Sequence, residues 1–192
     1  FTESGPLAVL PLSDFQKSNR GSLVWTVLES SREELLSCDE ETFMSMLTQY
    51  FGERLGRIMQ VGKRVAYPLS LTLAREQVRP GLVLLGNVAH TLHPVAGQGL
   101  NLALRDSAAL VRQLVIAKEQ QVAPGEVRNL QAYLESQNQD QFESVLFTDQ
   151  TVKLFSNNQW GHSAIRKLGL LGLELMPSMR SRFAQSAMGL KP

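Results

Sequence analysis

The segment "LVLLGNVAHTLHPVAGQGLNLALRD", residues 82–106, decides how the chain is interpreted. Residues 82–85 form a continuous apolar run, which is typical of a strand buried on both faces of a parallel sheet. A glycine-rich loop follows, and residues 101–120 then repeat apolar positions at helical spacing. The predicted apolar face of that helix consists of Leu104, Ala108, Val111 and Val115. We therefore predict a buried strand, a glycine loop and a helix.

The loop before this helix could bring its backbone close to a ligand. Gly86 ends the predicted strand, and Gly97 and Gly99 flank Gln98 just before the helix, where glycines permit close approach. The first N–H groups of a helix lack intrahelical partners and lie at the positive end of its dipole, so they suit an anion or a polarised carbonyl. The same arrangement also forms an ordinary corner in α/β proteins, so spacing alone leaves both interpretations open.

Several other site types are disfavoured. The loop fits neither G-x-G-x-x-G nor G-x-x-x-x-G-K-[ST], so it does not support a dinucleotide or nucleoside triphosphate site. His90 and His93 have no acidic or cysteine partner within the loop, which argues against a metal. Cys38 has no obvious base, and no G-x-S-x-G occurs. A net charge of +1, from 19 basic and 18 acidic residues, predicts no nucleic-acid partner.

The composition and the remaining segments predict a globular α+β chain, with 43% hydrophobic residues in a length of 192. Residues 7–12 and 21–28 predict an antiparallel strand pair, and residues 62–74 alternate as in a third strand. Ser37 and Glu40 could form a capping box for a helix that ends near Gly52. Residues 126–155 predict another helix after the break at 124–125, and the tail is helical with an interruption at Pro177.

The chain's surroundings can also be anticipated. A single parallel-type strand cannot form a sheet, so we expect its neighbours in sequence that this chain lacks. One cysteine is compatible with a reducing compartment, and no apolar stretch reaches the roughly 20 residues that span a bilayer. We expect a cytoplasmic protein. An apolar tail with basic residues could make peripheral contact with the inner face of the membrane or dock a partner; these residues are Arg166, Lys167, Arg180 and Arg182.

The pattern G-N-V-A-H-x-x-x-P-x-x-G-Q-G-x-N-x-x-x-x-D, residues 86–106, closely resembles the second FAD-binding motif of aromatic-ring flavoprotein monooxygenases, the para-hydroxybenzoate hydroxylase class. "FTESGPLAVLPLS", "GKRVAYPLSLTLA" and the long helical tail resemble its ubiquinone-biosynthesis branch. The resemblance extends over essentially the whole chain. In this family the motif follows the last strand of the FAD domain and covers the ribityl chain and the pyrimidine edge of the isoalloxazine.

The resemblance implies a set of FAD-contacting residues: Gly86, Asn87, Pro94, Gly97, Gln98, Gly99, Leu100 and Asn101. Asn87 stands where the family usually has an aspartate that hydrogen-bonds a ribityl hydroxyl, and asparagine lacks the charge that strengthens such a bond. Pro94 would lie beside the ring. The N–H groups of Leu100 and Asn101 would face the flavin N1–C2=O edge, where reduced flavin carries negative charge. Asp106 is expected to be structural.

The implied function is that of an FAD-dependent monooxygenase that hydroxylates the ring of a polyprenylated phenol in ubiquinone biosynthesis. NAD(P)H would be the electron donor and O2 the co-substrate, through a flavin C4a-hydroperoxide, so no catalytic acid–base pair is expected in this chain. Other ubiquinone-pathway enzymes are expected as partners. Two alternatives stay open: a related hydroxylase of different ring position, and a non-catalytic interaction module with a degenerate flavin site.

The implied fold is an α+β or α/β fragment. Residues 1–78 would belong to a substrate-binding β-sheet layer, residues 79–123 to the last strand and helix of the FAD domain, and residues 124–192 to a helical C-terminal region. The family's first motif, G-x-G-x-x-G, binds the ADP half of FAD and is absent from this sequence. We therefore expect the C-terminal half of an enzyme, which by itself is inactive and binds FAD weakly or not at all.

Strand residues are candidates for the wall of a substrate cavity, although ordinary sheet core is the simpler interpretation; they are Leu7, Val9, Leu10, Leu12, Trp25 and Tyr67. Arg64 and Arg75 lie near the predicted third strand and could orient a phenolate. Solvent-exposed strand ends are the simpler explanation for both arginines.

Overall fold

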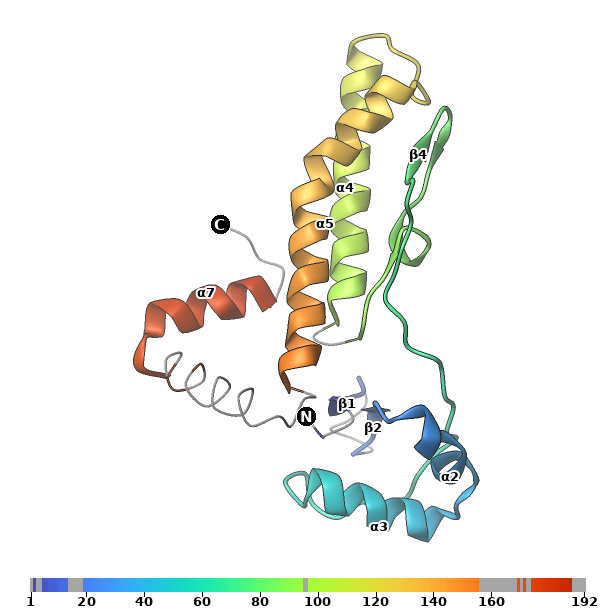
Figure 1. Cartoon of the computed structure of the whole chain (residues 1–192), viewed down its shortest axis with the longest axis vertical. Helices are drawn as coiled ribbons and strands as arrows, with labels where there is room; N and C mark the ends of the chain where they lie inside the picture. The colour runs from blue at the N-terminus through green and yellow to red at the C-terminus, as the bar shows by residue number, and fades with distance from the viewer. Residues whose placement is uncertain are drawn as a thin grey trace. The chain divides into compact units, whose positions relative to one another are not determined.

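The computed structural model describes residues 2, 5–13, 19–94, 97–155, 169, 171 and 174–187 (Figure 1). The chain divides into two compact units, one containing Phe1–Pro68 and the other Leu69–Lys153. The second unit holds both long helices, whereas the sequence predicted a boundary at 123/124 between them. The mixture of helices and strands agrees with the predicted class. The domain assignment itself stays a prediction.

The first unit begins with the predicted strand pair. β1 (Leu7–Pro11) pairs antiparallel with β2 (Gly21–Trp25), with Leu7 opposite Trp25 and Pro11 opposite Gly21. Pro11 is tolerated because a two-stranded sheet has only edge strands. The antiparallel pair is confirmed, and β2 ends at Trp25.

Three short helical elements follow: η1 (Glu29–Ser31), α2 (Arg32–Ser37) and α3 (Glu40–Phe51). Leu35, Phe43 and Leu47 are their buried core residues. Trp25 of β2 packs edge-on against the Phe43 ring, with 5.7 Å between ring centroids. The apolar faces of the helices and one face of the strand pair therefore form a single core.

The predicted capping box of Ser37 and Glu40 is wrong. Ser37 is the last residue of α2, and its hydroxyl donates to the Glu33 carbonyl at 2.8 Å. Asp39 caps α3 instead, because its carboxylate accepts the Thr42 N–H at 2.7 Å, and the same contact lowers the pKa of Asp39. α3 ends at Gly52, as predicted, with φ of 76°.

The second unit contains two pairs of short strands, so it has less extended structure than the sequence predicted. β3 (Thr72–Leu73) pairs antiparallel with β6 (His90–Thr91), and β4 (Val78–Arg79) pairs antiparallel with β5 (Leu82–Val83). The predicted strand over 62–74 is reduced to β3. Pro68 within that stretch cannot donate to a ladder, and Tyr67 beside it is 76% exposed.

The predicted parallel strand at residues 82–85 is also not found. β5 instead returns from β4 as a hairpin through the predicted turn at Pro80, with Gly81 at φ 74°. Leu82 is 51% exposed, so this strand is not covered on both faces in the structure. A continuous apolar run does not specify which strand it pairs with. Here the turn at Pro80 and Gly81 pairs β5 with β4.

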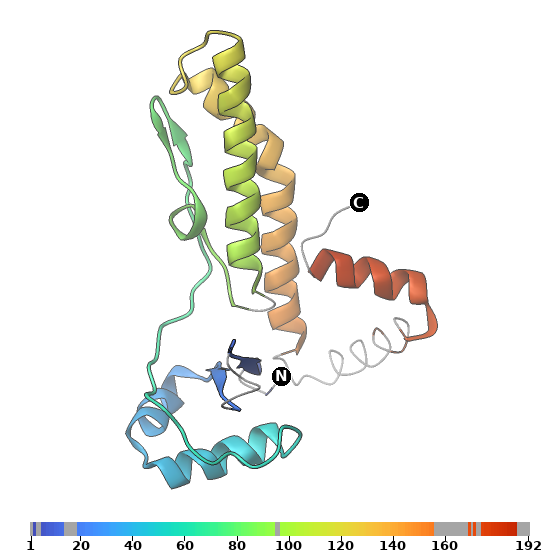
Figure 2. The ribbon, with the colours of Figure 1, turned by 180° about the vertical axis from the view of Figure 1, so that it is seen from behind.

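Two long helices form the body of the second unit. α4 (Gln98–Glu119) and α5 (Val127–Phe155) lie side by side in both views (Figures 1 and 2). Arg105 of α4 donates to Asp140 of α5 at 2.6 Å, and Gln113 donates to Asn129 at 2.9 Å, which gives an antiparallel register. Both helices were predicted from their periodicity.

The buried face of α4 differs from the predicted one. The predicted residues are exposed, with Leu104 at 60%, Val111 at 59% and Val115 at 50%, and Ala108 is also exposed. The residues buried on the face toward α5 include Leu102, Asp106, Ala109 and Ala117. The polar contacts with α5 select this face, which is offset from the apolar stripe.

The turns at one end of the second unit meet closely. The N–H of Gly81, in the β4–β5 turn, donates to the Gly125 carbonyl, in the α4–α5 turn, at 2.8 Å. A Cβ on Gly125 would lie 2.9 Å from the Gly81 Cα, so this approach requires glycine. The contact attaches the hairpin to the helix pair.

The tail contains α7 (Pro177–Ala187). Pro177 starts this helix rather than only interrupting one, as its fixed φ permits at a first helical position. Arg166 and Lys167 lie outside the described residues, while Arg180 is exposed. Over the part of the chain that the structure describes, no helix combines the length and apolarity needed to cross a lipid bilayer.

Candidate functional site

The segment between β5 and α4 folds back on α4. η2 (Gly86–Val88) packs against this helix, and a Cβ on Gly86 would lie 3.6 Å from the Ala103 Cβ. Gly86 has φ of 63°, a conformation that favours glycine. Asn87 is exposed, and its carbonyl accepts the Thr91 hydroxyl at 2.9 Å. The asparagine side chain is therefore accessible beside the start of α4.

The helix starts earlier than predicted. Gly97 is the N-cap of α4, in the left-handed conformation with φ of 63°, and Gln98 is the first helical residue. The N-cap carbonyl accepts the N–H of Asn101 as the first intrahelical bond, so the amides of Gly99 and Leu100 have no acceptor within the helix. The Asn101 N–H therefore has an acceptor within the helix, and its side chain is half-buried. The flavin contact of Asn101 stays a prediction.

The start of α4 offers open space and backbone donors. A Cβ on Gly97 or Gly99 would meet no described atom within 4 Å, and Leu100 is 70% exposed. Pro94 is also exposed, whereas the Gln98 residue is only 2% exposed and faces the interior. No acidic residue lies in the first turn to oppose an anion. These features fit the edge of a flat, electron-rich ring.

A buried polar network lies behind this segment. His90 Nε2 and Asp106 Oδ2 are 2.7 Å apart, with side chains 2% and 0% exposed. The amide of Gln141 donates to the same carboxylate oxygen at 3.1 Å, and Gln77 donates to Gln141 at 3.0 Å. The network joins β6, α4 and α5. A structural role for Asp106 agrees with this placement.

Sequence reasoning missed the partnership of His90 with Asp106. The available signal was that Asp106 follows Leu102 by four residues, so both lie on one helix face and a buried carboxylate there needs a donor. The contact was missed because the prediction placed the buried face of α4 on the stripe through Leu104, and Asp106 does not belong to that stripe. His93 is half-buried, and burial lowers its pKa. Among the described residues, no group of three or more metal-ligating side chains occurs.

Arg64 is engaged in the first unit. Its guanidinium donates to the Leu35 carbonyl at 2.8 Å and to the Cys38 carbonyl, and it lies 4.9 Å from the centre of the Phe43 ring. These contacts fasten the extended segment after α3 to the helical core. The geometry therefore gives Arg64 a structural role and does not support the predicted contact with a phenolate.

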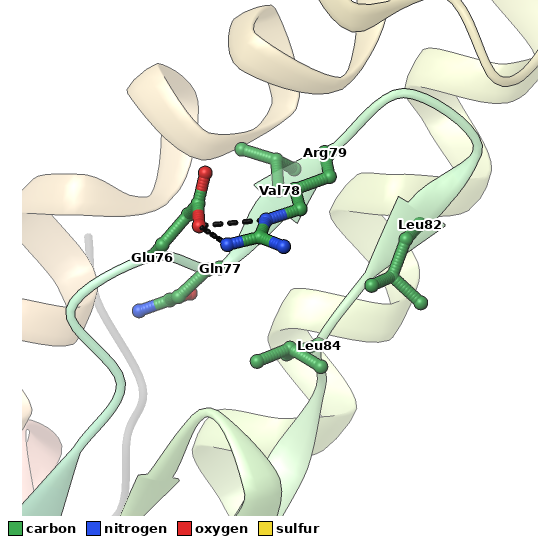
Figure 3. Close-up of a pocket in the computed structure, with 6 residues that line it drawn as sticks. All are labelled: Glu76, Gln77, Val78, Arg79, Leu82 and Leu84. Carbon is green, nitrogen blue, oxygen red and sulfur yellow. Dashed lines mark hydrogen bonds and ion pairs between the residues drawn. The ribbon is translucent and has the colours of Figure 1, made fainter.

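A pocket of about 190 Å³ lies on the β4–β5 hairpin (Figure 3) and is lined by Glu76, Gln77, Val78, Arg79, Leu82 and Leu84. Arg79 and Glu76 form an ion pair of 2.6 Å there. Pockets for small molecules usually measure about 300–1,000 Å³. None of the predicted cofactor residues lines this pocket. It is therefore a poor candidate for the cofactor site.

Tyr133 of α5 gives a test of the packing inside the second unit. Its residue is 0% exposed, and its hydroxyl has no partner among the described residues. Replacing Tyr133 with Phe is expected to leave the chain equally stable or about 1 kcal/mol more stable, because an unpaired buried hydroxyl is costly. Chemical denaturation at pH 7 measures this, with the exposed Tyr67→Phe as the control. A loss above about 1 kcal/mol would reveal a hydrogen bond to this hydroxyl.

The same variant should change the alkaline stability. Burial, and secondly the Asp106 charge, raise the pKa of Tyr133 above its usual value of 10.0. The folded chain therefore keeps this proton where the unfolded chain loses it. The associated stability is complete below pH 10 and falls as the pH rises further. Tyr133→Phe should lose less stability than the native chain above pH 10.

Comparison with known proteins gives consistent matches. Residues 1–138 match the family described as FAD binding domain. The chain is 38% identical over 189 residues to ubiquinone hydroxylase UbiL of Rhodospirillum rubrum, covering 98% of the chain and 43% of the relative. It is 34% identical over 190 residues to 3-demethoxyubiquinol 3-hydroxylase of Escherichia coli, covering 99% and 47%.

A human protein is also similar. Ubiquinone biosynthesis monooxygenase COQ6, mitochondrial, of Homo sapiens is 30% identical over 203 residues, covering 88% of the chain and 42% of the relative. The chain thus spans less than half the length of each of these relatives.

Proposed function

Because the chain belongs to the FAD binding domain family, we propose that it supplies the flavin-edge contacts of an FAD-dependent hydroxylase of ubiquinone biosynthesis. The observation that carries this is the open start of α4, where Gly97 and Gly99 leave space in front of the amides of Gly99 and Leu100. The relatives named as ubiquinone hydroxylases and monooxygenases support the same assignment.

Each exposed element of the segment has a role in the proposal. FAD, when bound, supplies the redox chemistry for inserting an oxygen atom into an aromatic ring. The amides of Gly99 and Leu100 donate to the N1–C2=O edge, and the positive end of the helix dipole stabilises negative charge there. Asn87 offers its side chain to a ribityl hydroxyl. Pro94 lies at the exposed surface where the ring would rest.

The proposed substrate is a polyprenylated phenol, with NAD(P)H as electron donor and O2 as co-substrate. The relatives' names place them in ubiquinone chemistry, and one names a demethoxyubiquinol as the molecule hydroxylated. The sequence resemblance favours 2-octaprenyl-6-methoxyphenol hydroxylase, and a different ring position is the alternative. Contact with other enzymes of the pathway or with a membrane surface is part of the same proposal and rests on the basic, apolar tail.

A comparison of two flavins tests the proposal. The sequence lacks the G-x-G-x-x-G motif that binds the ADP half, so this chain should contact only the ring and ribityl parts. Titration followed by flavin fluorescence should give micromolar or weaker binding, with FAD and FMN affinities within about threefold of each other. FAD bound about tenfold or more tightly than FMN, or no binding of either, would contradict the proposal.

A further inference from the structure

The two ends of the candidate site are joined by one buried contact. His90 lies three residues after Asn87, and Asp106 lies in α4 beyond the unpaired amides of Gly99 and Leu100. We propose that the His90–Asp106 hydrogen bond positions residues 86–94 and 97–101 for cofactor binding, which makes His90 and Asp106 positioning residues. The cofactor part of this inference rests on the proposed function, while the positioning part stands on the geometry.

The contact is a buried side-chain bond from this segment to α4, whereas the segment's other described hydrogen bonds are local or run to residues 72–74. The Thr91 hydroxyl bonds the Asn87 carbonyl four residues away, and the Gly97 N–H bonds the Pro94 carbonyl three residues away at 3.4 Å. β6 pairs with β3 over only two residues. The His90–Asp106 bond is buried and connects the segment to α4. It therefore fixes the segment relative to the helix.

Asp106 is fixed in place because a second side chain also hydrogen-bonds to it. Its Oδ2 atom accepts from Gln141 of α5 as well as from His90, and Gln141 accepts from Gln77 in turn. A carboxylate oxygen that accepts twice requires hydrogen on His90 Nε2, which selects that tautomer. Loss of the imidazole would therefore release the segment while Gln141 still holds Asp106.

The position of the segment matters because the proposed contacts come from both of its ends. Asn87 approaches from η2, and the amides of Gly99 and Leu100 come from α4. A binding constellation must be held within about 0.5 Å by the groups behind it. His90 is 1% exposed and Asp106 is 0% exposed, so both act from behind the surface without needing to touch the ligand.

Hydrogen–deuterium exchange on the full chain tests the positioning part. In His90→Leu, amide exchange in residues 86–91 and in residues 101–104, the first hydrogen-bonded amides of α4, should rise about tenfold, while residues 110–117 and the middle of α5 stay unchanged. His90→Gln retains an N–H donor and should restore most of the protection. Thr91→Val is the matched control, because it removes only the local bond to Asn87 and should leave residues 101–104 of α4 protected.

Flavin titration of the same variants tests the cofactor part. His90→Leu should weaken FAD and FMN binding about tenfold, with His90→Gln close to the native chain. Unchanged exchange in His90→Leu would overturn the positioning role. Faster exchange with unaltered flavin affinity would overturn the link to the cofactor. Faster exchange in a chain whose native form binds no flavin would instead overturn the proposed function and leave the positioning role intact.

Discussion

Replacing Asp106 with Ala is expected to lower the free energy of unfolding by about 2–6 kcal/mol, because each buried donor that loses its acceptor costs about 1–3 kcal/mol. The carboxylate is 0% exposed and accepts from both His90 and Gln141. Its removal leaves two buried donors without an acceptor. A substantial part of the stability of a domain of this size, about 5–15 kcal/mol, would be lost.

Equilibrium denaturation in urea measures this effect. Asp149→Ala is the matched control, because Asp149 forms an exposed pair with Lys153, whose side chain is 72% exposed. Such surface pairs contribute about 0–1 kcal/mol. Asp106→Asn should fall between the two, since a single amide oxygen retains an acceptor but adds a donor beside other donors. A loss below about 1 kcal/mol in Asp106→Ala would mean that the network does not hold the fold.

Replacing Gly99 with Leu is expected to change stability and flavin binding in opposite directions. Gly99 lies in the first turn of α4, and leucine is a far better helix former, so the chain should gain up to about 1 kcal/mol. A Cβ at this position meets no described atom within 4 Å, so the side chain would enter the space proposed for the ring. Crowding of about 1–3 kcal/mol corresponds to tenfold to hundredfold weaker flavin binding.

Thermal denaturation and flavin titration of the same sample separate the two effects. Gly62→Leu is the control, because a Cβ there also meets no described atom within 4 Å, but the position lies outside the candidate site. This control should bind flavin as the native chain does. A stabilised Gly99→Leu chain with native flavin affinity would place the ring elsewhere. Weaker binding in Gly62→Leu as well would point to a nonspecific effect.

The helices could be predicted from sequence more reliably than the strands. Helix α5 follows from local periodicity, and the break before it follows from Pro124 and Gly125. β5 could not be placed, because the apolar run at 82–85 states only that the segment is hydrophobic. Its partner is chosen by the Pro80 turn, which returns it onto β4. The predicted cap at Ser37 is wrong because Asp39, two residues later, accepts the Thr42 N–H and starts α3.

The location of the candidate site could be predicted from the motif, but the buried His90–Asp106 contact behind it could not. Glycine spacing marked the start of α4 to within a few residues, because the conformation of Gly97 is a local property. The His90–Asp106 contact depends on which face of α4 meets α5. The apolar stripe through Leu104 indicated the wrong face, and the polar contact of Arg105 with Asp140 was not apparent from either helix alone.

The most direct test of the central claim is to follow the backbone amides of the chain by NMR during titration with FAD, FMN and ADP. The account predicts that FAD and FMN shift the same amides, those of Gly86, Asn87 and residues 98–100, with similar affinities, and that ADP shifts none of them. Shifts confined to the pocket around Glu76 and Leu84, or an equal response to ADP, would contradict it.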